Sequence, residues 1–309
     1  MRRACALLLA AMLSACAHLE SEGLREDSGT LPERSEVVGV PFYPQQEHYC
    51  GPASLAMVLS WSGEKVAQEK VAPQVFTPGR AGSFRTDIIA AARRHGRLAV
   101  PVRELQGVLA ELGAGHPVLV FQNLGLDWWP RWHFAVAIGY DLSRGTVILH
   151  TGRTPAREVA LATFERTWDR GGSWALVVLP PGDLPAGKGP LDVLEAAVGF
   201  ERTGKDKASE RVYAAVTRRW PGQLGGWMGL GNSRYRRGDL EGAEKAFRGA
   251  LRQHPRAAAA WNNLAVVLKE RGRREAARDA ALAAVRFGEE ERDTYRRTLE
   301  EIGGLEGAP

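Results

Sequence analysis

The chain has little cysteine, and neither a long basic tract nor a second long apolar run occurs in it. Its three cysteines are Cys5, Cys16 and Cys50, and the first two lie in an apolar N-terminal segment. If that segment is removed and Cys16 is modified, Cys50 has no cysteine to pair with, which excludes a structural disulfide. Cys50 is then either a buried, inert thiol or a nucleophile.

The charges are balanced and interspersed. The formal net charge of the 309 residues is +5, and acidic residues separate the basic ones. Without a basic stripe, the sequence predicts no nucleic-acid partner. Beyond the N-terminus no run of about 18 apolar residues occurs, so we expect no membrane-spanning helix. The length favours two domains, each able to bury a core.

Residues 1–15 predict an export signal. A basic pair precedes a short apolar run that cannot span a bilayer. The run ends in LSAC, which resembles a bacterial lipobox and implies cleavage before Cys16 and lipidation of Cys16. The protein would then be anchored by lipid in the cell envelope, and Ala17 suits an outer-membrane site facing the periplasm. The alternative is an ordinary secretory signal in which Cys16 is incidental.

Composition divides the rest of the chain into four parts. Residues 16–35 are polar and predict a flexible tether. Residues 36–182 alternate short strand patterns with helical patterns, and the Pro- and Gly-rich residues 183–190 predict a linker. In residues 191–304, Ala, Leu, Arg and Glu at helical spacing replace the β-branched runs. The expected architecture is an α+β domain followed by an all-α domain.

The all-α part contains an internal repeat. Similar residue types recur after 34 residues: Trp227, Gly231 and Gly238 correspond to Trp261, Ala265 and Gly272. This resembles the tetratricopeptide repeat, and a weaker copy begins near residue 191. The resemblance implies a solenoid of helical hairpins whose groove binds a peptide or a partner protein. The alternative is a solubilising spacer.

A helix is expected to begin at Cys50. The run CGPASLAMVLSW gives it an apolar face, and Pro52 suits a first helical turn. The unpaired N–H groups at a helix start favour negative charge, so we expect a lowered pKa for the Cys50 thiol. Gly51 is expected to leave room for a substrate backbone beside the sulfur.

One of the seven histidines, His133, begins an alternating apolar strand, HFAVAIGY. A strand start can hold an imidazole over a cleft, which makes His133 the candidate base for Cys50. Trp128, Trp129 and Trp132 flank it, and they are either core residues or an exposed ledge for substrate.

Together these motifs resemble the bacteriocin-leader-processing peptidases of the papain-like superfamily. The residues that carry the resemblance are an upstream glutamine, Cys50-Gly51-Pro52-Ala53, His133-Phe134 and Gly139-Tyr140-Asp141. It covers residues 37 to about 180 and implies a papain-like α+β fold, a thioester mechanism on peptide bonds, and no metal or cofactor. In such enzymes the nucleophile's own N–H and an upstream amide hold the oxyanion. Gln45 is the preferred amide here, and Gln46 the other candidate.

The sequence departs from that family at one position. An Asp or Asn usually follows the next strand and orients the histidine, whereas the aligned residue here is about Thr151. His150 and Asp127 are the other candidates for this role. Two functions remain: a lipid-anchored cysteine peptidase whose repeats dock a substrate or a partner protein, or a weak or inactive peptide-binding scaffold. Acyl transfer by the same pair is a minor third.

Overall fold

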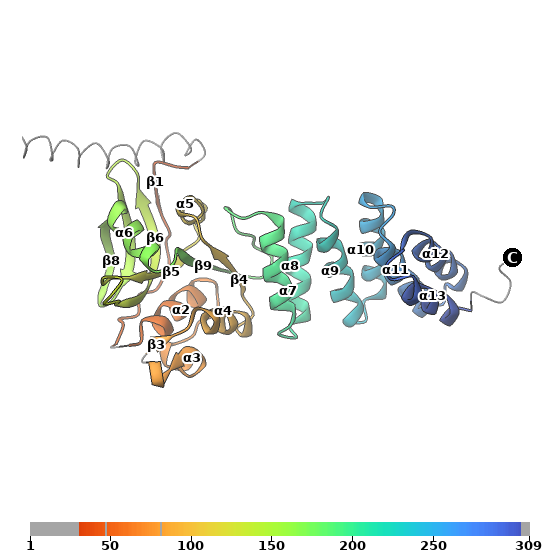
Figure 1. The fold of residues 1–309 in the computed structure, drawn as a ribbon, viewed down its shortest axis with the longest axis horizontal. Coiled ribbons are helices and arrows are strands. Elements are labelled where there is room, and N and C mark those ends of the chain that lie inside the picture. Colours follow the sequence, from red (N-terminus) through yellow and green to blue (C-terminus); the bar gives the residue numbers. More distant parts are fainter. Residues whose placement is uncertain (1–30, 47, 81, 304–309) are drawn as a thin grey trace, which may run out of the picture.

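The computed structural model describes residues 31–46, 48–80 and 82–303 (Figure 1). The predicted signal segment, Cys16 and most of the predicted tether lie outside these residues. An α+β domain comes first, and a row of helices leads away from it (Figure 1). None of the helices in these ranges has the length and apolarity needed to cross a bilayer.

The first domain is built on an antiparallel sheet of seven strands. Their order is β4-β9-β5-β6-β7-β8, and β1 also pairs with β6. The strands are β1 (Arg34–Glu36), β4 (Leu98–Val102), β5 (Val118–Asn123), β6 (Trp132–Asp141), β7 (Thr146–Thr151), β8 (Thr154–Ala160) and β9 (Trp174–Leu179). β5 and β1 pair with successive parts of one edge of β6, while β7 pairs with its other edge. The strand that begins with Trp132 and His133 is therefore the centre of the sheet.

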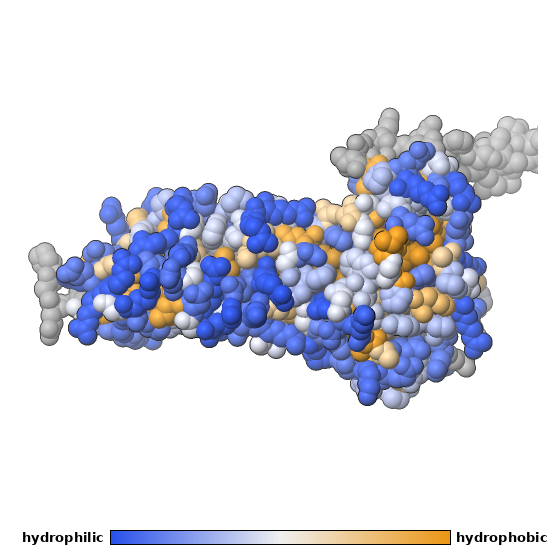
Figure 2. Space-filling view, turned by 180° about the vertical axis from the view of Figure 1, so that it is seen from behind, coloured by the Kyte–Doolittle hydropathy of each residue, from blue (hydrophilic) through white to orange (hydrophobic). Residues whose placement is uncertain are grey.

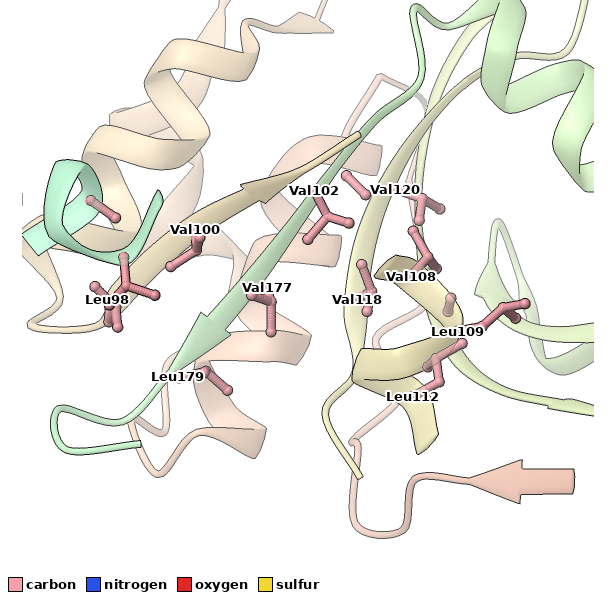
Figure 3. Close-up of a cluster of buried hydrophobic side chains, with 14 of the residues drawn as sticks. Leu98, Val100, Val102, Val108, Leu109, Leu112, Val118, Val120, Val177 and Leu179 are labelled. Atoms are coloured by element: carbon pink, nitrogen blue, oxygen red, sulfur yellow. The ribbon is translucent and has the colours of Figure 1, made fainter. Parts of the chain in front are cut away.

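Alternation along the central strands separates two apolar layers. Phe134, Val136 and Ile138 pack with α2 (Cys50–Trp61), α3 (Gln68–Val75) and α4 (Arg85–Arg94). Ala135 and Ala137 pack with α5 (Leu105–Gly113) and α6 (Leu161–Arg170). Figure 3 shows part of this second layer, where valines of β4, β5 and β9 meet leucines of α5. Both faces of the sheet are covered, which fixes β6 between the helices.

A small hairpin stands apart from the main sheet. It consists of β2 (Phe76–Thr77), the 3-10 turn η1 (Pro78–Arg80) and β3 (Gly82–Ser83). The Phe76 ring stacks on Tyr49, with ring centroids 5.3 Å apart. This contact holds the hairpin at the N-terminal end of α2.

The structure differs from the sequence prediction at one boundary and in one strand. Arg34–Glu36 form a strand, Leu31 packs against the core, and Tyr140 donates its hydroxyl to the Pro32 carbonyl at 3.0 Å. The last residues of the predicted tether thus belong to the folded domain. Residues 83–113 have a mainly helical pattern that does not predict β4, but Leu98–Val102 form this strand and pair with β9 at the edge of the sheet.

The second part consists of helical hairpins. The described chain after residue 189 contains α7 (Pro190–Glu201), α8 (Asp206–Arg219), α9 (Leu224–Arg236), α10 (Leu240–Gln253), α11 (Ala258–Glu270), α12 (Arg274–Phe287) and α13 (Arg292–Glu301). Trp227 Nε1 donates to the Pro221 carbonyl at 2.7 Å, and Trp261 Nε1 donates to the Pro255 carbonyl at 2.9 Å. The same bond recurs one repeat later, as the predicted period requires. Hydrophilic residues cover most of these helices on the face that Figure 2 shows.

The first repeat helix is fused to the α+β core. Val193, Ala197 and Phe200 of α7 belong to the same buried cluster as Leu98 and Val100 of β4. An edge strand exposes unpaired backbone groups, and α7 covers this one. The predicted linker also contacts the α+β domain, because the Gly187 N–H donates to Glu111 Oε1 of α5 at 2.9 Å. The two parts of the chain therefore share a continuous core.

Candidate active site

Cys50 is the first residue of α2, as the sequence predicts. It is half-buried and lines a cavity of about 1070 Å³. A side chain at position 51 would place its Cβ 2.4 Å from Ser83 Oγ, so this position requires glycine. The expectation for Gly51 is corrected here, because β3 fills the space that was assigned to a substrate backbone.

His133 lines the same cavity from the start of β6. Its Nε2 lies 2.8 Å from Thr151 Oγ1, at the end of β7. Because Nε2 is engaged, Nδ1 is the ring nitrogen that has no hydrogen bond within the part of the chain that the structure describes. A threonine hydroxyl both donates and accepts, so Thr151 holds the ring without selecting its tautomer, unlike a carboxylate.

The other two candidates for orienting His133 are placed elsewhere. Both ring nitrogens of the buried His150 are used, since Nδ1 accepts from the Ala156 N–H at 3.0 Å and Nε2 lies 3.3 Å from the Val40 carbonyl oxygen. Asp127 is exposed in the β5–β6 hairpin loop. Thr151 is therefore the one of the three that contacts His133.

Burial governs the charges of the pair. Desolvation raises the pKa of the Cys50 thiol, and it outweighs the lowering by the backbone N–H groups of Phe134, Gly51 and Cys50 itself. Desolvation, with a smaller effect of Arg131, lowers the pKa of His133 to about 4. The predicted lowering of the thiol pKa is therefore wrong. A raised thiol pKa and a lowered imidazole pKa both favour the uncharged forms near pH 7, and among the described residues no hydrogen bond joins Cys50 to His133.

Gln45 ties together the elements that carry these residues. Its Nε2 donates to Ser54 Oγ in α2 at 3.2 Å and to the Phe134 carbonyl in β6 at 3.1 Å. Its Oε1 accepts from the Gly152 N–H at 2.9 Å, and its own N–H donates to the Gly152 carbonyl at 2.9 Å. The buried amide is thus bonded beside Cys50, His133 and Thr151 at once.

This geometry differs from the expected oxyanion role of Gln45. An amide nitrogen has two N–H groups, and both are bonded to the protein. Gln46 is exposed and lines the cavity, and its side chain has no hydrogen-bond partner within the described ranges. Of the two glutamines, Gln46 is the one with free donors facing the cavity.

The tryptophan cluster is a surface feature. Trp128, Trp129 and Trp132 are exposed by 79%, 69% and 55%, which decides between a core and a ledge. Trp132 lines the cavity and stacks on Phe121, with centroids 5.4 Å apart.

Sequence reasoning missed three arginines of the cavity. Arg85, Arg153 and Arg170 line it, and none of the described lining residues is an aspartate or glutamate. They come from α4, the β7–β8 turn and α6, so no local pattern connects them.

Comparisons with known proteins agree with this architecture. Residues 37–175 match the Peptidase_C39 like family, and residues 194–252 and 228–292 match the tetratricopeptide repeat. None of the curated proteins matches the chain.

Solved structures resemble each part of the chain. A putative C39-like peptidase from Bacillus anthracis is 21% identical over 48% of this chain and 98% of its own, with a TM-score of 0.42. A double glycine motif protease from an AMS/PCAT transporter, in complex with the leader peptide, is 23% identical over 47% and 93%, with a TM-score of 0.38. The Yersinia enterocolitica type III secretion chaperone SycD, in complex with a peptide of the translocator YopD, is 16% identical over 36% and 88%, with a TM-score of 0.34.

The half-buried Cys50, the threonine-held His133 and the shared cavity thus lie in residues that match a peptidase family, and the repeated tryptophan bonds lie in residues that match a repeat family. The chain combines a peptidase C39-like domain with tetratricopeptide repeats.

Proposed function

We propose that this protein is a cysteine peptidase that is exported and held by a lipid on Cys16 in the bacterial cell envelope. The observation that carries the catalytic part is the single cavity lined by Cys50 and His133, with His133 bonded to Thr151. The repeats are proposed to dock the protein substrate or a partner protein. Asn263 Nδ2 donates to Asn232 Oδ1 at 3.0 Å between α11 and α9, so half-buried amides of neighbouring repeats lie together, and a docked peptide is proposed to contact them.

The reaction begins from the neutral pair. As Cys50 Sγ attacks the carbonyl carbon of the scissile bond, the thiol proton moves to His133 Nδ1. The oxyanion is stabilised by the Cys50 N–H at the start of α2 and by the amide of Gln46. His133 then returns the proton to the leaving amine as the C–N bond breaks, which leaves a thioester.

Water completes the cycle. It attacks the thioester while His133 Nδ1 takes its proton, the carboxylic acid leaves, and the proton returns to Cys50 Sγ. Thr151 keeps the imidazole in place through Nε2, and Gln45 keeps α2, β6 and the β7–β8 turn in register. Burial raises the pKa of the Cys50 thiol, which adds to the cost of moving its proton to His133.

That cost favours a second candidate, a peptide-binding scaffold with little or no turnover. The specific observations are the neutral pair and the threonine in place of a carboxylate. A scaffold would bind peptides in the same cavity and leave them intact.

The experiment that decides between them compares the periplasmic peptides of a Cys50→Ala strain with those of its parent. A peptidase predicts that intact substrates accumulate in the variant and that their fragments disappear. Incubation of those substrates with the purified full chain should restore the fragments, and the His133→Ala protein should not. Identical peptide populations in both strains would contradict the proposal and favour the scaffold.

The anchor has a test of its own. Cys16→Ser is expected to move the protein from the membrane pellet to the soluble fraction. Cys5→Ser, in the same segment, is the matched control and should leave it in the pellet. A Cys16→Ser protein that stays with the membrane would count against the lipid.

A further inference from the structure

Two of the cavity arginines form one cluster with aromatic rings. The guanidinium carbon of Arg85 lies 5.4 Å from the centroid of Phe121, and the same ring stacks on the exposed Trp132 and packs on the buried Phe134. Arg170 donates through Nη2 to the Asn123 carbonyl at 3.3 Å, and Asn123 is the register partner of Trp132. Arg85 donates through Nη1 to the Gly171 carbonyl at 3.5 Å, directly after Arg170. The two cations therefore meet at one end of the cavity, beside an aromatic shelf.

Most of their hydrogen-bonding capacity is unused. A guanidinium has five N–H donors, and each of these arginines has one bond to a carbonyl. Arg170 Nε is buried and has no partner in the described part of the chain. Neither arginine forms an ion pair with a described residue, although ion pairs are frequent among the repeats. No Asp or Glu among the described residues lines this cavity or pairs with either arginine.

Unbalanced arginines beside an aromatic ring match a particular ligand chemistry. A carboxylate accepts two parallel N–H bonds from a guanidinium, and such charge-assisted pairs are strong and directional. The Phe121 ring lies 5.4 Å from the guanidinium carbon of Arg85, and Trp132, which stacks on the same ring, offers an exposed apolar surface. A peptide that carries a carboxylate next to a bulky apolar side chain satisfies both.

We propose that Arg85, Arg170, Phe121 and Trp132 form the specificity pocket of this domain and select peptides with a carboxylate beside a bulky apolar residue. The inference rests on the proposed function, because the pocket belongs to the cavity of Cys50 and His133. The carboxylate comes from an Asp or Glu side chain or from a peptide C-terminus.

Binding is measured by calorimetry on the full chain carrying Cys50→Ala, so that no turnover occurs. The probes are three heptapeptides with one Leu each. The first is capped at both ends and contains Glu-Leu, the second is capped and contains Gln-Leu, and the third contains Gln and ends in Leu with a free carboxylate. A carboxylate peptide is expected to bind about tenfold more tightly than the Gln-Leu peptide. Preference for the first or for the third identifies the source of the carboxylate.

The arginine variants test the pocket itself. Arg85→Gln and Arg170→Gln, each in the Cys50→Ala background, should bind the three peptides equally. Arg170→Lys keeps the positive charge but loses the paired N–H donors of the guanidinium, so it should retain only part of the preference for carboxylate peptides. Arg157→Gln, exposed on β8 away from the cavity lining, is the matched control and should keep all of it. Thermal unfolding of each variant verifies that it is folded.

The outcomes for this pocket and for the proposed function are separable. Equal binding of all three peptides by the folded Cys50→Ala chain overturns the inference, and so does a preference that survives in both arginine variants. If the wild-type chain cleaves peptides without regard to their carboxylates, the proposed function holds and this inference fails. If the preference is present but nothing is cleaved, the peptidase fails and the specificity pocket stands.

Discussion

The two parts of this molecule hold their helices and strands in place by different kinds of hydrogen bonds. In the repeats, a bond between residues six positions apart returns one period later, as Trp227 to Pro221 and Trp261 to Pro255. In the first domain, Gln45 bonds to Phe134, 89 residues away, and to Gly152, 107 residues away. A fault in a repeat is therefore expected to stay local, whereas a fault at Gln45 disturbs every element of the site.

Among the substitutions that test this difference between the two parts, Gln45→Ala is expected to have the largest effect on stability and activity. Gln45→Ala leaves the buried Phe134 carbonyl and Gly152 N–H without partners, and each such group costs about 1–3 kcal/mol. We expect about 2–5 kcal/mol less stability in urea unfolding and a loss of peptidase activity, because α2, β6 and the β7–β8 turn lose their common link.

Gln46→Ala is the matched control for that experiment. Its exposed side chain supports no described contact, so stability should stay within about 0.5 kcal/mol. Activity should fall by about 10²–10³, as for the loss of one oxyanion donor. If Gln45→Ala were as stable as the wild type and lost activity alone, the oxyanion role would return to Gln45.

A second prediction concerns the thiol. Because burial raises its pKa, Cys50 in the folded chain should react with iodoacetamide more slowly at pH 7 than the same thiol in urea. The rate should rise with pH over a range above that of the unfolded chain, since only the thiolate reacts. Cys5→Ser and Cys16→Ser leave Cys50 as the only cysteine even in a chain that retains its N-terminal segment. Faster alkylation in the folded state at pH 6 would contradict the raised pKa and support the lowered thiol pKa that the sequence predicted.

The sequence reveals those features of the site that depend on local patterns. The apolar run after Cys50 and the alternation after His133 predicted a helix and a strand that the structure contains. β4 was missed because its five residues contain Pro101 and lie between helical patterns. The direction of the Cys50 pKa shift was predicted wrongly. The helix start, which lowers the pKa, can be read from the local sequence, whereas the burial that raises it depends on the whole fold. Arg85 and Arg170 were missed for the same reason: only the folded chain brings α4 and α6 together.

A third prediction tests whether repeat faults stay local. Gly231 faces the Phe247 ring, and a Cβ there would lie 2.4 Å from it. One period later the two positions are Ala265 and Ala281, a larger residue facing a smaller one. Gly231→Ala should cost about 1–3 kcal/mol through overpacking, and Phe247→Ala on top of it should cost less than its own single-site effect.

The controls for this pair lie in the other domain. Alkylation of Cys50 and peptide cleavage should be unchanged by Gly231→Ala, because the strain is confined to α9 and α10. Additive costs in the double variant would show that the two positions do not compensate each other. A changed Cys50 reactivity would show that the shared core around α7 transmits repeat strain to the active site.

The smallest effect is expected at Thr151. Its hydroxyl is a single long-range contact that positions His133. Thr151→Val keeps the shape and removes the partner of His133 Nε2, and kcat should fall several-fold to about tenfold with KM unchanged. Thr151→Asn offers an amide oxygen that accepts only, so it selects the tautomer with the proton on Nε2 and leaves Nδ1 free for the thiol. We therefore expect kcat to rise above wild type in Thr151→Asn and to stay near it in Thr151→Ser, which retains the hydroxyl. Equal kcat in all three variants would mean that β6 alone fixes the imidazole, and the 2.8 Å bond to Thr151 would then have no part in catalysis.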